Sequence, residues 1–261
     1  MADNGAPGAQ LTSLERALRK NTMQMERLLA HQVWSALGEE KVLTFPYQNL
    51  EISFHLPEGW FDLLQRIILL NRKFYEVPLL ENIRARLGPR PVIADIGANI
   101  GNHSVFFAKV CKAEHVHAFE PIPHIQKILR RNTELNAMSG FTLYPFALGE
   151  AKGNIGVDMF NPANLGSTTL APGRDGQIPI KTLDSLELDG LSLLKIDVEG
   201  MQDAVLRGAS NTIRESRPIL VIEAFKKNQE RAKTTALLGE MGYAVDQIIG
   251  HNIIALPAAH S

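Results

Sequence analysis

Residues 91–120 contain the pattern that constrains the fold more than any other part of the chain. An apolar run ends at Asp95, a glycine-rich turn follows at residues 97–101, and an amphipathic segment with helical spacing leads to a second apolar run that ends at Glu120. This order predicts a strand, a turn, a helix and a second strand with an acidic residue at its end. We therefore expect a crossover of the kind that binds a nucleoside.

The chemistry of this turn narrows the choice of nucleoside. Small residues let the main chain approach a ligand, and the start of the following helix offers unpaired N–H groups. An acid at the position of Glu120 can accept hydrogen bonds from the two hydroxyls of a ribose. The turn reads D-x-G-A-N-x-G rather than G-x-G-x-x-G, and Asp95 would repel a pyrophosphate but can accept from an ammonium group. This pattern favours S-adenosylmethionine; the alternative is a structural turn without a ligand.

Length and composition allow one α/β domain with an appendage, because 261 residues that are 45% apolar can bury a full core. The formal net charge of -1 gives no electrostatic reason to bind nucleic acid. The single cysteine, Cys111, excludes an intrachain disulfide and a cysteine-rich metal site. The first residues lack the layout of a signal peptide and no apolar run is long enough to span a bilayer, so we expect a cytoplasmic protein.

The N-terminal part, residues 1–44, is predicted to form a helical extension. Within it, apolar residues recur at spacings of three and four over residues 11–37, while Asn21 and Gln32 interrupt a strict heptad. A helix with such a stripe packs on its own domain or on a second copy of the chain. Both arrangements stay open, so homodimerisation through this helix is one of two expectations.

Residues 45–90 are expected to lead into the main fold, with a short hairpin or edge strand at 45–56 and two helices over 59–87. Strands and helices then alternate through residues 91–261, as an α/β fold requires, and this part is predicted to be the domain that binds S-adenosylmethionine. The alternation breaks at 149–184. Because so long an insert is usually functional or disordered, we expect a hairpin and loop over the active site.

The end of the chain decides the architecture. Residues 243–249 and 252–256 alternate on either side of Gly250 and His251, which predicts an antiparallel pair. A mostly parallel sheet that ends in such a hairpin is typical of class I methyltransferases, whereas a dinucleotide-binding fold would add a parallel sixth strand. The predicted fold class is therefore α/β, a Rossmann-like class I methyltransferase sheet preceded by an N-terminal helical extension.

Acidic residues follow several predicted strands at their carboxyl ends, where ligands bind in open α/β sheets. Burying several carboxylates at one mouth is costly unless they meet cations or hydrogen-bond donors, so we expect them to face a ligand. Lys195, inside a predicted strand, is expected to reach one of them. The alternatives are a helix N-cap for Asp197 or Glu199 and a surface ion pair for Glu223. The acidic residues at strand ends are Asp95, Glu120, Asp197, Glu199 and Glu223.

From residues 73–76 onward the chain resembles the FkbM-type methyltransferase family. The motifs that carry the resemblance are KFYE at 73–76, ADIGANIGNHS at 94–104, FEPIP at 119–123, FALGE at 146–150, NLGSTTL at 164–170, IKTLDSL at 180–186, LLKIDVEG at 193–200 and PILVIEAF at 218–225. The combination of KIDVEG with an IGANxG turn is specific. The N-terminal helix lies outside the resemblance.

The resemblance implies transfer of a methyl group from S-adenosylmethionine, usually to an oxygen and often on a sugar or secondary metabolite. An acceptor hydroxyl is a weak nucleophile, so it needs a base or a metal ion. Carboxylates would also suit Mg²⁺, and a base is preferred because the motif does not by itself establish a metal. The expected cofactor-binding residues are Asp95, Gly97, Ala98, Asn99, Gly101, Ser104, Glu120, Pro121, Ala147 and Asp197. The candidate bases are Asp197, Glu199, Glu223 and His124, and the first three are the candidate metal ligands.

Three functions therefore compete. The first is O-methylation of a hydroxyl on a sugar or glycosylated metabolite, with a small molecule or glycan as partner. The second, N-methylation of nucleic acid or an amine, would use an Asn/Asp-Pro-Pro-aromatic turn where this chain has Asp197, Val198 and Glu199. The third is a methyltransferase-like scaffold that binds a partner through the N-terminal helix, and the presence of both Asp95 and Glu120 argues against it.

Overall fold

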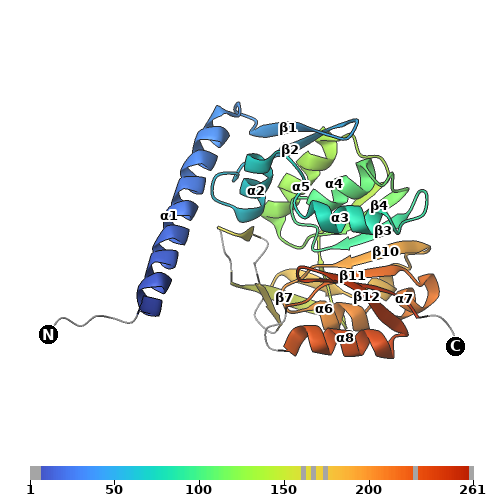
Figure 1. Cartoon of the computed structure of the whole chain (residues 1–261). Helices are drawn as coiled ribbons and strands as arrows, with labels where there is room; N and C mark the ends of the chain where they lie inside the picture. Colours follow the sequence, from blue (N-terminus) through green and yellow to red (C-terminus); the bar gives the residue numbers. More distant parts are fainter. Residues whose placement is uncertain (1–6, 160–162, 166–168, 173–175, 226–228, 259–261) are drawn as a thin grey trace.

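A seven-stranded sheet runs through the centre of the molecule (Figure 1). The computed structural model describes residues 7–159, 163–165, 169–172, 176–225 and 229–258. In spatial order the strands of the sheet are β12 (Tyr243–Ile249), β13 (Asn252–Pro257), β11 (Ile219–Glu223), β10 (Leu191–Ile196), β3 (Val92–Ile96), β4 (His115–Phe119) and β5 (Phe141–Tyr144). Neighbours from β11 to β5 are parallel, whereas β13 is antiparallel to both β11 and β12. The predicted fold class, including its antiparallel ending, is confirmed.

The strand order reverses between β3 and β10, which are hydrogen-bonded neighbours although they lie far apart in the sequence. From β3 the chain continues outward to β4 and β5, whereas β10 is followed outward by β11 on the opposite side. In open α/β sheets a crevice forms at the carboxyl ends of the strands at such a reversal. The ends of β3 and β10 are therefore the expected place for a ligand.

Helices cover both faces of the sheet (Figure 1). The strands separate two cores because successive side chains point to opposite faces: Ile93 packs in one core and Ala94 in the other. One face carries α2 (Leu63–Asn71), α3 (Val77–Arg84), α4 (Asn102–Lys109) and α5 (Pro123–Leu135). The other face carries α6 (Gln202–Arg207), α7 (Ser210–Ser216) and α8 (Glu230–Glu240).

A hairpin of β1 (Val42–Tyr47) and β2 (Leu50–His55) confirms the expectation for residues 45–56. It forms a sheet of its own above α5 rather than an edge of the main sheet (Figure 1). The His55 N–H donates to Asn132 Oδ1 at 2.6 Å, and Asn136 Nδ2 donates to Ser53 O at 2.7 Å. These bonds fix the hairpin on the helix.

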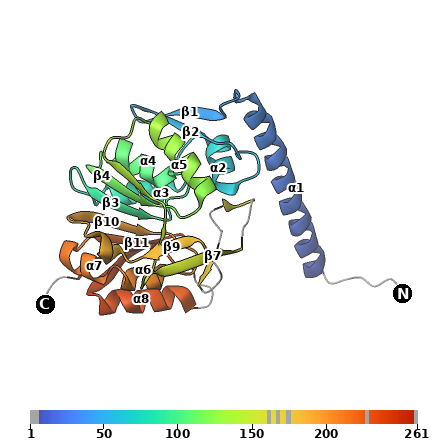
Figure 2. The same cartoon turned by 180° about the vertical axis from the view of Figure 1, so that it is seen from behind.

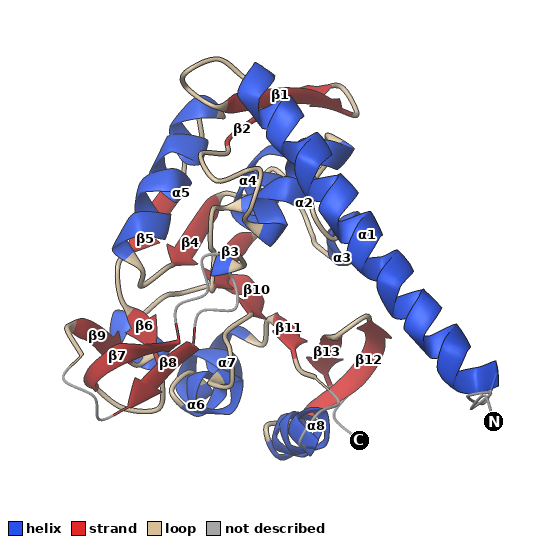
Figure 3. Cartoon of the chain, turned by 90° about the vertical axis from the view of Figure 1, so that its left-hand side faces the viewer, coloured by secondary structure: helices blue, strands red, loops and turns tan. Residues whose placement is uncertain are grey.

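The insert forms a second sheet beside the main one (Figures 2 and 3). Its strands, in spatial order, are β6 (Ala147–Leu148), β9 (Ile178–Lys181), β7 (Gly153–Met159) and β8 (Thr169–Pro172). This is more regular structure than the hairpin and loop that the sequence predicts. A 3-10 helix, η2 (Leu183–Leu186), follows it. Residues 160–162, 166–168 and 173–175 of the insert lie outside the described residues.

The N-terminal helix α1 (Pro7–Ala36) projects from the body (Figures 1 and 3). Its C-terminal end is anchored, since Ala30 is fully buried and Trp34 Nε1 donates to Leu56 O at 2.8 Å. Farther toward its N-terminus, Leu18 is 66% and Met25 70% exposed. Packing on its own domain therefore applies only to the C-terminal end of α1. None of the helices in the described part of the chain is both long and apolar enough to cross a bilayer.

Candidate active site

A cavity of about 320 Å³ opens at the carboxyl ends of β3, β4, β10 and β11. It lies at the reversal of strand order, where a ligand is expected. Nine residues predicted from the sequence line it, and they come from both sides of the reversal. They are Gly97, Ala98, Asn99, Glu120, Pro121, Ala147, Asp197, Glu199 and Glu223.

The glycine turn after β3 has a backbone that other residues could not adopt without strain. Gly97 has a φ of +77°, and a Cβ there would lie 1.8 Å from the main-chain oxygen of Asp197. The N–H groups of Gly97 and Ala98 both donate to Phe119 O, at 3.1 and 3.0 Å. The turn is thus pressed against β10 and tied to β4, which leaves its outer surface facing the cavity.

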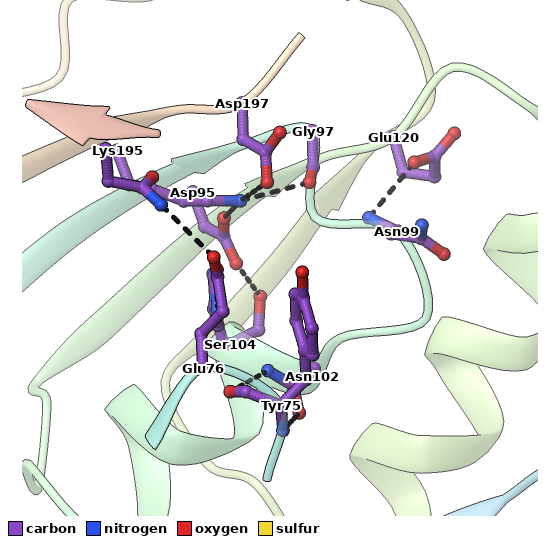
Figure 4. A network of polar contacts seen from close by, with 12 residues as sticks. Tyr75, Glu76, Asp95, Gly97, Asn99, Asn102, Ser104, Glu120, Lys195 and Asp197 are labelled. Atoms are coloured by element: carbon purple, nitrogen blue, oxygen red, sulfur yellow. Dashed lines mark hydrogen bonds and ion pairs between the residues drawn. The ribbon is translucent and has the colours of Figure 1, made fainter. Parts of the chain in front are cut away.

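Asp95 is not among the residues that line the cavity. It lies between Lys195 and Ser104 (Figure 4). It is fully buried, and its Oδ2 accepts from the Ser104 hydroxyl at 2.6 Å. Its Oδ1 is 3.0 Å from Lys195 Nζ. The sequence suggested that this carboxylate accepts from the ammonium of a donor, but its near partner is a lysine of the protein. Asp95, Ser104 and Gly101 therefore shape the turn without lining the cavity.

Lys195 joins the two sides of the strand reversal (Figure 4). Its Nζ lies 3.0 Å from Asp95 Oδ1 and 3.2 Å from Asp197 Oδ2, and it donates to Gly97 O at 3.2 Å. The expected contact between Lys195 and the acidic cluster is confirmed. Burial alone would lower the pKa of Lys195, but the attraction of Asp197 and Asp95 outweighs it and raises the pKa above its usual value.

Glu120, at the end of β4, is held by main-chain donors. Its Oε2 accepts from Asn99 N at 3.1 Å and its Oε1 from Ile122 N at 2.8 Å. The side chain is only 5% exposed, and burial raises its pKa to about 7 despite these two bonds. Each oxygen keeps one lone pair free, so the carboxylate can still accept from a pair of ligand hydroxyls.

Three acids form the opposite wall of the cavity. Burial would raise the pKa of Asp197, but the ammonium of Lys195 and a hydrogen bond from Glu223 lower it. Burial, and then repulsion from Asp197, raises the pKa of Glu223 to about 9. Burial and Asp197 also raise the pKa of Glu199. The ionised member of the cluster nearest a cation is therefore Asp197, while Glu223 keeps its proton at neutral pH.

The same wall includes residues that sequence reasoning did not select. Tyr75 lines the cavity, and its main chain exchanges two hydrogen bonds with the Asn102 side chain, at 2.9 and 3.2 Å. His103, only 6% exposed, lies 3.4 Å from Glu76 and also lines the cavity. The signal was available for Tyr75, because it stands in the KFYE motif.

Apolar side chains form a further wall of the cavity. It is built by Leu64 and Ile67 of α2 and by Leu165 of the insert, which all line the cavity. Asp62, only 1% exposed, joins α2 to the insert. Its Oδ1 accepts from Gln65 N at 3.0 Å and its Oδ2 from Leu165 N at 2.9 Å. The insert is thereby fixed to the start of α2.

His124 does not reach the cavity. Its side chain is 53% exposed and its Nε2 pairs with the carboxylate of Glu58. Its neighbour Ile125 points inward and lines the cavity, so the first turn of α5 directs the imidazole to the outside. His124 lies outside the residues that line the cavity, and the proposal below does not use it.

The residues present do not fit a metal site. Among the described residues there is no group of three or more His, Cys, Asp or Glu side chains placed to hold a metal ion. Asp197 is already paired with Lys195, and burial and the charge of Asp197 raise the pKa of Glu223 to about 9, which disfavours the ionised form that a metal ligand needs. A Mg²⁺ ion bound by Asp197, Glu199 and Glu223 is therefore not supported, and no step below uses a metal.

Comparison with known proteins gives three findings. The sequence model of the methyltransferase FkbM domain matches residues 95–249, more than half of the chain. Methyltransferase sdnD of Sordaria araneosa is 27% identical over 199 residues, which cover 62% of this chain and 76% of sdnD. Hexuronic acid methyltransferase AglP of Haloferax volcanii is 30% identical over 140 residues, which cover 50% of this chain and 54% of AglP.

The solved structures include a similar fold at low identity. The crystal structure of methyltransferase FkbM from Methylobacillus flagellatus KT aligns with a TM-score of 0.48 and 20% identity, over 73% of this chain and 60% of that chain. The chain thus spans less than two thirds of the length of this solved structure. The arguments below rest on the family match and on the geometry of the cavity.

Proposed function

Because the chain belongs to the FkbM methyltransferase family, we propose that it uses S-adenosylmethionine to methylate a hydroxyl oxygen of a sugar or glycosylated metabolite. The observation that carries this proposal is the single cavity in which the glycine turn and Glu120 face the acidic cluster of Asp197, Glu199 and Glu223. One side suits a nucleoside and the other a hydroxylated group. A methyl transfer requires both partners in one enclosed site.

The donor side is proposed to hold S-adenosylmethionine as follows. At Gly97, Ala98 and Asn99 the donor can approach the main chain closely, because these residues line the cavity at the glycine turn. Glu120 accepts hydrogen bonds from the ribose hydroxyls. Ala147 and Pro121 line the same side next to Phe146. When bound, the donor supplies an electrophilic methyl group on a sulfonium.

The acceptor side is proposed to hold and deprotonate the hydroxyl. In-line displacement needs the acceptor oxygen held on the axis of the breaking bond, which the apolar wall and the acidic cluster together can provide. A carboxylate of the cluster then takes the hydroxyl proton as the oxygen attacks. Asp197 and Glu223 are the residues proposed for this role, and Glu199 is proposed to orient the acceptor from the edge of the cavity.

A sugar or glycosylated acceptor is the finer part of the proposal. AglP, described as a hexuronic acid methyltransferase, supports a sugar, but it covers only half of this chain. Carboxylates beside an apolar wall also suit a polyhydroxylated ring, because they accept from hydroxyls while the ring carbons pack on Leu64 and Ile67. We further propose that the exposed stripe of α1 pairs with a second copy of the chain.

Isothermal calorimetry with S-adenosylmethionine and S-adenosylhomocysteine tests the donor assignment. We expect both to bind at one site per chain, and absence of binding by both would falsify the donor assignment. A panel of sugar nucleotides and glycosylated metabolites, with formation of S-adenosylhomocysteine as readout, then tests the acceptor class. Methylation of amines but not of hydroxyl compounds would overturn the assignment to oxygen.

A further inference from the structure

We propose that Glu223 and Asp197 share one proton in the donor-free protein and that binding of the positively charged donor expels it. The catalytic base would then form only when the methyl donor is in place. This inference deepens the proposed function and rests on it, because it concerns the same cavity. Before the donor binds, Glu223 is protonated and Asp197 is ionised; after it binds, both are ionised.

The contact between the two groups requires a proton. Glu223 ends β11 and Asp197 follows β10, and the residues before them, Ile222 and Ile196, are paired across these two parallel strands. The two carboxyl groups therefore start from adjacent positions, and both line the cavity. Two ionised carboxylates at adjacent positions repel each other and cannot hydrogen-bond, whereas one protonated group can donate to the other, so their placement favours one bound proton. Lys195 lies 3.2 Å from Asp197 and keeps that group ionised. The proton therefore resides on Glu223.

The surroundings of Glu223 favour the protonated form. The anionic groups near it are Asp197 and Glu199 beyond β10 and Glu76 at the start of α3. Lys195 is the only lysine or arginine among the described residues that line the cavity, and Asp95 and Asp197 already share it. Burial and these acids together raise the pKa of Glu223 to about 9. The neutral or titratable groups on the remaining sides are Tyr75, His103, Asn252 and His251.

The methyl donor would add a positive charge near Glu223, which has no lysine or arginine partner in the described lining of the cavity. S-adenosylmethionine carries a sulfonium charge that S-adenosylhomocysteine lacks, while the ribose and the amino-acid end are the same in both. A positive charge entering this cavity favours the ionised form of a nearby carboxyl group, so Glu223 releases its proton to solvent. The two carboxylates can then accept the proton of an acceptor hydroxyl.

Over one catalytic cycle, the carboxyl pair releases one proton and takes up one proton. One proton leaves Glu223 when the donor binds. As the methyl group moves from sulfur to oxygen, the hydroxyl proton passes to the carboxyl pair and the sulfonium becomes a neutral thioether. The pair is again singly protonated, as it was in the donor-free protein. The net release of one proton per methyl transfer is what the reaction of a sulfonium with an alcohol requires.

Calorimetry in two buffers of different ionisation enthalpy tests this directly, because the difference in heat counts the protons released. At neutral pH we expect S-adenosylmethionine to release up to one proton more than S-adenosylhomocysteine. Protons that Glu120 gains or loses cancel in this comparison, since both ligands carry the ribose. Equal proton numbers for the two ligands would overturn the proposal.

Two variants assign the proton to a residue. Glu223→Gln keeps the size of the side chain and a hydrogen-bond donor toward Asp197, and it should remove the difference between the two ligands while both still bind. Glu199→Gln, in the same cavity, should keep the difference. A difference that survives in Glu223→Gln, or that disappears in Glu199→Gln, contradicts the assignment to Glu223. If the wild-type protein binds neither ligand, the proposed function itself is wrong.

Discussion

The two halves of the cavity are built in different ways. The half that we propose to hold S-adenosylmethionine, called the donor half below, comes largely from one continuous segment, residues 97–121, whose backbone is fixed by a tight turn and by bonds to Phe119 O. The half that we propose to hold the acceptor, called the acceptor half below, collects side chains from α2, residues 163–165, the turn after β10 and the end of β11. The comparison teaches that local backbone geometry places the donor side, whereas tertiary contacts place the acceptor side.

The largest effect is expected at the donor turn, from Gly97→Ala. The new Cβ would meet Asp197 O at 1.8 Å in a backbone with positive φ, so the turn must shift away from β10. We expect a loss of about 3 kcal/mol or more in the free energy of unfolding, together with loss of donor binding. Urea denaturation and calorimetry measure the two effects.

Gly38→Ala is the matched control, because a Cβ at Gly38 has nothing within 4 Å and its φ is not positive. It should leave the free energy of unfolding within about 0.5 kcal/mol of wild type. A Gly97→Ala protein as stable as this control, with normal donor binding, would show that the donor half is less constrained by its backbone than we argue.

The next effect concerns Glu120→Gln, which keeps the shape of the side chain but weakens it as an acceptor. We expect the affinity for S-adenosylmethionine and for S-adenosylhomocysteine to fall by the same factor, about 10- to 100-fold, because both share the ribose. Calorimetry gives both values. A loss confined to one of the two ligands would place Glu120 away from the ribose.

Glu120 also gives the donor-free protein a pH dependence with a definite sign. Its pKa is about 7 in the folded state and about 4.3 in an unfolded chain. Between these values the folded state holds a proton that the unfolded chain has lost, so the free energy of unfolding falls as the pH rises. Denaturation across this range should show a smaller decline for Glu120→Gln than for wild type.

The donor half could be predicted from the sequence because its signal is local. Gly97, Asn99 and Glu120 stand at fixed distances in one strand-turn-helix-strand pattern, and the turn as built requires glycine at position 97. The mostly parallel main sheet with its antiparallel ending followed from the same alternation and from the closing hairpin. Asp95 was predicted to accept from the ammonium of the donor, but its burial against Lys195 depends on a strand about a hundred residues farther along the chain.

The acceptor half could not be predicted in the same way. Leu165 is held beside the cavity by Asp62, from which it is separated by 103 residues in the sequence, and a bond from Leu63 N to Ala163 O supports the same segment. His124 stood next to the FEPIP motif in the sequence, yet its direction on the first turn of α5 takes it to Glu58. Closeness in sequence therefore identified the segment but not the side chain. The second sheet was predicted only in part, as a hairpin and loop; Pro145 and Phe146 separate β6 from β5, so β6 pairs with β9 instead of extending a strand of the main sheet.

A smaller effect is expected from Asp62→Asn, which tests whether tertiary contacts place the acceptor wall. Asparagine can still cap α2 through one oxygen, but it cannot also accept from Leu165 N. We expect a loss of about 1 to 2 kcal/mol in the free energy of unfolding and faster hydrogen exchange at the Leu165 amide. The affinity for S-adenosylhomocysteine should stay unchanged, because the donor half is not touched.

Asp184→Asn provides the matched control for this change. Asp184 also accepts from two main-chain donors, Asn211 N at 3.0 Å and Thr212 N at 2.8 Å, but it does not line the cavity. Asp184→Asn should lower the free energy of unfolding by a similar amount without changing hydrogen exchange at the Leu165 amide. Equal exchange at Leu165 in the two variants would show that Asp62 contributes stability alone and does not position the wall.

The smallest effect on the body is expected in α1, which belongs to neither half. Met25 and Leu28 are 70% and 66% exposed, so replacing both with Glu should change the free energy of unfolding by less than about 0.5 kcal/mol. Donor affinity should also stay the same. If the stripe pairs with a second copy, light scattering after gel filtration should show a dimer for wild type and a monomer for the variant. A monomeric wild-type protein would refute the pairing, whereas a dimer that persists in the variant would place its interface on the body.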